Sequence, residues 1–186
     1  LILNKTDGLT GKAVMPVKEG ELLPETYFFS FGDSRNSLIK RMHVGMKKFL
    51  SESWKKRAPR LPILNIKEAI ILASIIEKET GRSAERARVA GVFVNRLRLN
   101  MKLQSDPTVS FSITKGQVEL RRALSREDLK TPSLYNTYYI KGLPPGPITN
   151  PGRAAIKAAM NPLNTDELYF VADGKGGHIF SKNLDE

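Results

Sequence analysis

The sequence of 186 residues contains no cysteine and no long apolar run. Without cysteine the protein forms neither disulfides nor thiolate metal sites, although this absence fits any cellular compartment. Without a run of about eighteen apolar residues, the chain has no candidate transmembrane helix. Because the chain begins at Leu1 rather than at a methionine, we expect it to be an internal fragment that lacks a membrane anchor.

Histidine is also scarce, since the chain contains only His43 and His178. No helical His-x-x-His or Glu-x-x-His spacing is present, and such spacings are typical of metal sites. The sequence therefore predicts no metal and no cofactor.

Positive charge dominates, because the chain has 30 lysines and arginines but only 19 acidic residues, which gives a formal net charge of +11. This excess predicts attraction to a polyanion, which could be nucleic acid, anionic lipid or a carboxylate-bearing cell-wall glycan. The chain shows no recognisable RNP, helix-turn-helix or zinc pattern. We therefore expect no nucleic-acid partner, although a basic nucleic-acid-binding module stays open as an alternative.

The first part of the chain predicts a small accessory unit over residues 1–60. A short aromatic strand is expected at Tyr27–Phe31, followed by an amphipathic helix from Ser34 onward. Basic residues interrupted by prolines then form a linker, over residues 55–62. A boundary near residue 60 separates this unit from a second domain over residues 61–186.

The second domain is predicted to be of the α+β class. A helix should run from Ile66 to Thr80, with Asn65 as its N-cap and Gly81 as a left-handed end. It is apolar around most of its circumference, so we expect a central buried helix. Further helix caps are expected at Ser83, Asp106 and Asn150, and the segment 167–181 should form a C-terminal β-hairpin.

Two acids, Glu77 and Glu79, end the predicted central helix. Residues two apart on a helix point about 200° away from each other, so these acids do not act as a pair on one substrate. Small side chains, Ala73 and Ser74, lie one turn before Glu77 and leave room for a ligand, whereas isoleucines precede Glu79. A carboxyl set against apolar helix surface holds its proton near neutral pH. We therefore expect Glu77 to be a general acid.

Several segments together carry a specific resemblance. ASIIEKET, AERARVAGVFVNRL, LQSDPTV, YNTYYIKGLPPGPITNPG and YFVADGKGGHIF resemble, in order and spacing, the endolytic murein transglycosylase family, also called YceG-like. The upstream EGELLPETYFF is similar to the stretch before the catalytic domain of that family. The resemblance implies a cell-wall lyase that cleaves between N-acetylmuramic acid and N-acetylglucosamine and leaves 1,6-anhydromuramyl ends. It also implies that the first glutamate of EKET, Glu77, is catalytic.

The resemblance further implies a bacterial protein anchored in the cytoplasmic membrane, with the enzyme on the periplasmic side. Its partners would be peptidoglycan glycan strands and, in addition, peptidoglycan synthases of the penicillin-binding class. A single glutamate suffices for this reaction because the sugar supplies its own nucleophile. A glycan-binding protein without catalysis is the remaining alternative.

The remaining candidate residues would bind substrate, and each has a structural alternative. Asp106 is either a second carboxylate or a helix cap. Hydroxyl, amide and aromatic groups suited to sugars are found at Ser74, Asn95, Gln104, Ser105, Tyr135, Asn136, Thr137 and Tyr138. These residues are equally compatible with loop architecture and ordinary packing.

Overall fold

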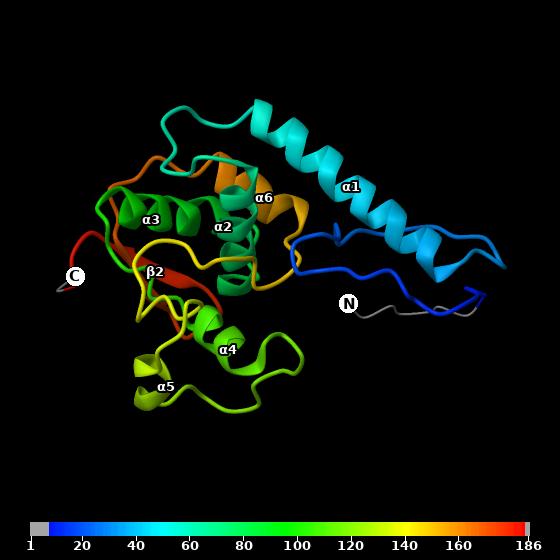
Figure 1. Ribbon diagram of the computed structural model, residues 1–186. Helices are drawn as coiled ribbons and strands as arrows, with labels where there is room; N and C mark the ends of the chain where they lie inside the picture. Colours follow the sequence, from blue (N-terminus) through cyan, green and yellow to red (C-terminus); the bar gives the residue numbers. More distant parts are fainter. Residues whose placement is uncertain (1–7, 185–186) are drawn as a thin grey trace.

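A computed structural model describes residues 8–184 of the chain. Within these residues the order is α1 (Arg35–Lys55), α2 (Ile66–Glu79), α3 (Arg86–Arg98), α4 (Asp106–Thr114), α5 (Arg126–Lys130), α6 (Arg153–Met160), β1 (Tyr169–Ala172) and β2 (His178–Ser181). Figure 1 shows α2, α3 and α6 grouped together, with α1 on one side and α4 and α5 on another. The predicted α+β class is confirmed.

Helix α2 lies at the centre of this group. Asn65 caps it by accepting a hydrogen bond from the Glu68 backbone N–H at 3.0 Å, as the sequence predicts. Every residue from Ala69 to Ile76 is buried. The predicted end is wrong, because Thr80 is an extended C-cap and Gly81 is not among the glycines with positive φ. The chain therefore leaves α2 directly after Glu79.

The predicted C-terminal hairpin is confirmed. Strands β1 and β2 pair antiparallel, with Tyr169 opposite Ser181 and Ala172 opposite His178. The hairpin is attached to α3 through Phe170, whose ring meets the ring of Phe93 edge-on at 5.7 Å. This contact brings β2 toward the end of α2 that carries the two glutamates.

The N-terminal part contains the predicted long helix but not the predicted strand. Ser34 caps α1 by accepting a hydrogen bond from the Ser37 N–H. The strand expected at Tyr27–Phe31 is absent from the described structure, where this segment is irregular. Its aromatic residues do not line a sheet, since Phe28 and Phe31 are exposed while Phe29 packs on a small apolar cluster. None of the helices in residues 8–184 has the length and apolar character to cross a membrane.

The main apolar core crosses the expected boundary near residue 60. Leu23, Met46 and Leu50 belong to the same cluster as the apolar residues of α2. A second cluster contains Leu9, Leu22, Leu38 and Met42. An independent domain over residues 61–186 stays a prediction.

Three predicted helix caps are displaced in the structure. The N-caps of α3, α4 and α6 are Glu85, Ser105 and Gly152 instead of Ser83, Asp106 and Asn150. The Asn150 side chain has a long-range role instead, because it accepts a hydrogen bond from Leu22 N–H and donates one to Glu19. It thereby attaches the N-terminal segment to the helical group.

Candidate active site

Glu77 is held by two interactions within the protein. Its Oε1 lies 3.4 Å from the Arg86 guanidinium, and its Oε2 accepts a hydrogen bond from the Gly152 N–H at 2.9 Å. Together these interactions engage both carboxylate oxygens and restrict the orientation of the side chain. The Glu77 carboxylate therefore has the environment of an ion pair.

The space expected beside Glu77 is filled by the chain itself. Ser74 is fully buried, and its hydroxyl accepts a hydrogen bond from the Ile148 N–H at 3.0 Å. The same hydroxyl donates to the Ile71 carbonyl. The segment that leads into α6 thus packs against the small side chains of α2. The Ser74 hydroxyl already has two hydrogen-bond partners within the protein.

Glu79 has the environment that the sequence argument assigned to Glu77. Burial raises the pKa of Glu79 to about 7, and the nearby charge of Asp106 acts in the same direction. The Ser105 hydroxyl, His178 and Arg96 lower this pKa in part. A carboxyl with such a pKa can donate a proton at neutral pH and can accept one afterwards.

Ser105 lies beside Glu79 with an unused hydroxyl. Its side-chain oxygen is buried and makes no hydrogen bond of ordinary geometry within residues 8–184. Its proximity nevertheless favours the ionised form of Glu79. Because buried hydroxyls are nearly always paired, this one is available to a bound ligand or to Glu79 itself.

The structure brings the predicted segments 104–106 and 136–138 together. The Gln104 N–H donates to the Thr137 carbonyl at 3.2 Å, and the Ser105 N–H donates to Thr137 Oγ1 at 2.9 Å. Tyr138 donates from its hydroxyl to Asp106 Oδ1 at 2.6 Å. Burial and this hydrogen bond raise the pKa of Tyr138. Asp106 is therefore positioned by a side chain and does not cap α4.

Three other candidate residues have internal roles. Asn95 donates from its amide to the carbonyls of Thr165 and Glu167, just before β1. The buried Asn136 donates to the carbonyls of Leu129 and Thr131. Tyr135 packs its ring against Phe111 at 4.9 Å. These side chains are used within the fold, and their contact with substrate stays a prediction.

Two residues near Glu79 were missed by the sequence argument. Arg96 is buried and donates to the carbonyls of Leu168 and Leu103, and burial lowers the pKa of Arg96. The sequence pattern that could have identified Arg96 is its position one helical turn after Phe93, which places a cation on the apolar face of α3. His178 lies within the predicted hairpin, and the structure places it in β2, where it lowers the pKa of Glu79.

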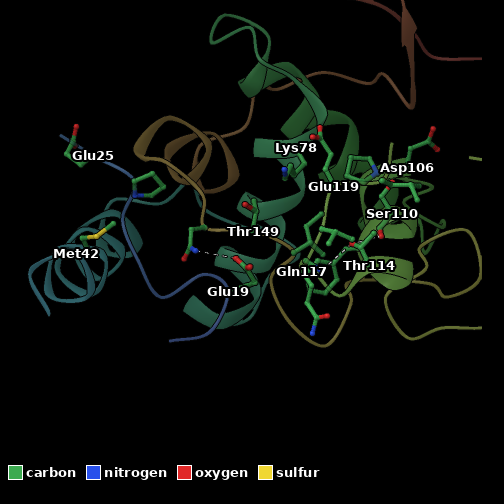
Figure 2. Close-up of a pocket in the computed structure, with 18 of the residues that line it drawn as sticks. Glu19, Glu25, Met42, Lys78, Asp106, Ser110, Thr114, Gln117, Glu119 and Thr149 are labelled. Atoms are coloured by element: carbon green, nitrogen blue, oxygen red, sulfur yellow. Dashed lines mark hydrogen bonds between the residues drawn. The ribbon is translucent and has the colours of Figure 1, made fainter. Parts of the chain in front are cut away.

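A groove of about 1330 Å³ lies next to this cluster. In Figure 2, Glu25 and Met42 lie on one side, Asp106 and Ser110 lie on the other, and Lys78 lies between them. Neither Glu77 nor Glu79 lines the groove itself. Asp106 links the two regions, because it lines the groove and also acts on the charge of Glu79.

The positive charge of the protein does not lie in this groove. The ionisable lining consists of four carboxylates, from Glu19, Glu25, Asp106 and Glu119, and a single cation, Lys78. Other cationic side chains are exposed on α1, including Lys40, Lys47 and Lys48. The groove therefore suits an uncharged sugar backbone better than a polyanion.

No metal cluster is found in the part of the chain that the structure describes, where three or more suitable His, Asp or Glu side chains do not gather. Glu77 is instead paired with Arg86. That the reaction needs no metal or cofactor stays a prediction.

Comparison with known proteins agrees with these features. The sequence profile of the YceG-like family matches residues 3–186. The chain belongs to the YceG-like family. The endolytic murein transglycosylase of Bacillus subtilis strain 168 is 37% identical over 97% of this chain and 49% of its own length. That of Streptococcus pneumoniae serotype 2 strain D39 is 34% identical over 90% of this chain and 30% of its own length.

A solved structure supports the same family assignment. The crystal structure of a YceG-like protein from Listeria monocytogenes has a TM-score of 0.75 and 36% identity, over 89% of this chain and 53% of the other. The chain thus spans about half of the Bacillus and Listeria relatives, and less of the Streptococcus relative. The YceG-like fold is therefore shared.

Proposed function

We propose that this YceG-like chain is the catalytic part of an endolytic murein transglycosylase that acts on peptidoglycan glycan strands. The observation that carries the proposal is the pKa of Glu79, which burial raises to about 7 beside a groove large enough for several sugars. Relatives that cover nearly all of the chain carry the name of this activity.

In the proposed reaction, Glu79 first acts as an acid. Its proton passes to the glycosidic oxygen between N-acetylmuramic acid and N-acetylglucosamine, and the bond from this oxygen to the anomeric carbon breaks. The C6 hydroxyl of the muramyl residue then attacks the anomeric carbon and returns its proton to Glu79. The product carries a 1,6-anhydro end, no water is consumed, and Glu79 is ready for another cycle.

Glu79 is favoured over Glu77 by its surroundings. Both oxygens of the Glu77 carboxylate already have partners within the protein, Arg86 and the Gly152 N–H. Ser105, Asp106 and Arg96 all act on the pKa of Glu79, and of these Asp106 also lines the groove. We therefore assign the role expected for Glu77 to Glu79, and glutamine variants of the two residues separate the assignments.

Asp106 supports a second candidate function, hydrolysis. Ordinary glycosidases use two carboxylates, one as acid and one as nucleophile or base. Asp106 is the carboxylate that acts on Glu79 most strongly. Its Oδ1, however, accepts a hydrogen bond from the Tyr138 hydroxyl, so this oxygen is already in use within the protein.

The products decide between these functions. Uncrosslinked glycan strands are digested with the protein, and the fragments are weighed by mass spectrometry. Fragments lighter by one water, released from the interior of strands, are expected for an endolytic transglycosylase. Reducing ends would indicate a hydrolase that uses Asp106. Binding without cleavage would indicate a glycan-binding protein, and salt-sensitive binding to nucleic acid would favour the basic nucleic-acid-binding module.

The cellular setting is proposed from the substrate. Peptidoglycan lies outside the cytoplasmic membrane, so the enzyme would act on the extracytoplasmic, periplasmic side. Anchoring in the inner membrane and cooperation with peptidoglycan synthases stay predictions from the family resemblance.

A further inference from the structure

A second hollow, of about 470 Å³, lies where the end of α1, the start of α3 and α6 meet. Helix α6 packs against both α1 and α3, and the Ala58 N–H, just after α1, donates to the Met160 carbonyl at 2.9 Å. Of residues 8–184, none lines both this hollow and the groove. We call it the basic hollow, and besides alanines its lining consists of Ser53, Lys56, Ser83, Arg86, Lys157 and Asn161.

The basic hollow carries the opposite charge to the groove. Its ionisable lining residues are three cations, Lys56, Arg86 and Lys157, and no carboxylate of the described residues lines it. Four carboxylates and one lysine line the groove instead. Because cations gathered in one place repel one another, an anion that binds between them lowers the electrostatic free energy. The charge of the lining therefore favours an anionic ligand.

Most hydrogen-bond donors of the basic hollow are not used by the protein. Within the described part of the chain, no hydrogen-bond or ion-pair partner is found for the side chains of Lys56, Ser83, Lys157 and Asn161. Arg86 is more buried, since its side chain is only 15% exposed, and its Nε makes no hydrogen bond within residues 8–184. A buried donor is nearly always paired, so the unpaired Nε is a second indication that an acceptor binds here.

The donors suit a phosphate group better than a carboxylate. A carboxylate has a single charge and two oxygens, whereas a phosphate group has up to about two charges and at least three accepting oxygens. The planar guanidinium of Arg86 matches two of these oxygens at once. We propose that the basic hollow is a binding site for a phosphate group, whose charge is neutralised by the three cations. Its oxygens accept hydrogen bonds from Ser83 and Asn161.

Arg86 connects the basic hollow with the end of α2. Its guanidinium lies 3.4 Å from Oε1 of Glu77, and the next residue of α2, Lys78, lines the groove. The site does not depend on which glutamate donates the proton, because neither Glu77 nor Glu79 lines the basic hollow. Two sources offer the phosphate group, a soluble phosphorylated ligand and a phospholipid headgroup, and these are distinguished by experiment.

The probe is inorganic pyrophosphate, titrated into the purified chain while backbone amide shifts are recorded by NMR at an ionic strength of about 0.15 M. We expect saturable shifts at residues 83–87 and 157–161. Lys157→Gln and Lys56→Gln should each weaken pyrophosphate binding about three- to tenfold, because each removes a charge-assisted hydrogen bond to the phosphate. The matched control is Lys102→Gln, which removes the same charge from an exposed position outside the basic hollow and should bind like the wild type.

Vesicles of phosphatidylcholine, with and without phosphatidylglycerol, distinguish the two sources. If pyrophosphate binds and phosphatidylglycerol vesicles sediment the wild type but not Lys157→Gln, the site takes a lipid headgroup. Pyrophosphate binding without sedimentation retains the site for a soluble phosphorylated ligand. Absence of saturable pyrophosphate binding would overturn the site, as would an equal loss of affinity in Lys102→Gln. Lys56 and Lys157 are both exposed, so their variants should fold. No glycan cleavage is measured, so the result is independent of the proposed function.

Discussion

The hydroxyl of Tyr138 donates a hydrogen bond of 2.6 Å to Oδ1 of Asp106. This bond joins the segment before α6 to the first turn of α4 and fixes a negative charge at the junction of the groove and Glu79. Asp106 acts on Glu79 in the opposite direction to His178. The pKa of Glu79, the proposed proton donor, is thus set by neighbours that act in opposite directions.

Asp106→Asn should move the alkaline limb of the pH profile of kcat toward lower pH. The charge of Asp106 raises the pKa of Glu79, so removing this charge lets Glu79 lose its proton earlier. Tyr138→Phe is the matched control, since it removes the hydrogen bond to Asp106 but keeps the charge of Asp106. The alkaline limb of the Tyr138→Phe profile should stay closer to that of the wild type. A shift of the Asp106→Asn limb to higher pH would contradict this electrostatic arrangement.

Glu79→Gln should reduce kcat by about 10²-fold to 10⁴-fold, because a general acid contributes in this range and an amide has no proton to transfer. Glu77→Gln should cost less than about tenfold, since it removes an ion pair with Arg86 and not the proton donor. Both are checked with purified glycan strands, after circular dichroism has confirmed folding. Equal losses would remove the distinction between the two glutamates, and a greater loss for Glu77→Gln would restore the original assignment.

Glu79 should also make the folded protein less stable as pH rises. Its pKa is about 7 when folded and 4.5 in the reference state, so between these values the folded state binds more protons than the unfolded state. The penalty is absent below about pH 4.5 and complete above about pH 7, where it reaches about 3 kcal/mol. Urea unfolding should therefore show that Glu79→Gln gains stability over wild type between pH 5 and pH 8. A constant difference across this range would refute the raised pKa.

Gly91→Ala should destabilise the protein by about 1 to 3 kcal/mol, because the added methyl overpacks the contact between α3 and the segment before β1. A Cβ at Gly91 would lie 2.6 Å from the Leu163 carbonyl oxygen and 2.8 Å from Thr165 Cγ2. Gly81→Ala is the control, since a Cβ there meets nothing within 4 Å. Thermal unfolding of the two variants measures the difference in their stability. Equal melting temperatures would show that the segment 163–167 moves aside to accommodate the added methyl group.

The parts of the fold that depend on local sequence were predicted well. Asn65 and Ser34 cap their helices as expected, because capping involves only the next three residues. The hairpin was likewise visible in its aromatic strands and the glycine-rich turn between them. The strand at Tyr27–Phe31 failed, because a strand needs a neighbour that the local pattern does not specify.

The choice between Glu77 and Glu79 depended on long-range packing. Spacing along α2 correctly separated the two acids and correctly found small residues beside Glu77. It could not show that the segment 148–152 fills this space, with Ile148 bound to Ser74 and Gly152 bound to Glu77. Nor could it show that α3, α4 and β2 surround Glu79. A carboxyl acquires a high pKa from such tertiary neighbours.

The attachment of Asn150 to the N-terminal segment has a consequence for the groove. Glu25 and Met42 lie on one side of it, while Ser110 and Thr114 lie on the other (Figure 2). Glu19 and Asn150 also line the groove, and the Asn150 side chain holds the segment of Glu19 and Leu22 against the segment before α6. Loss of these two hydrogen bonds would free the N-terminal wall of the groove from the helical group. The shape of the groove therefore depends on contacts between residues that are more than a hundred positions apart in the sequence.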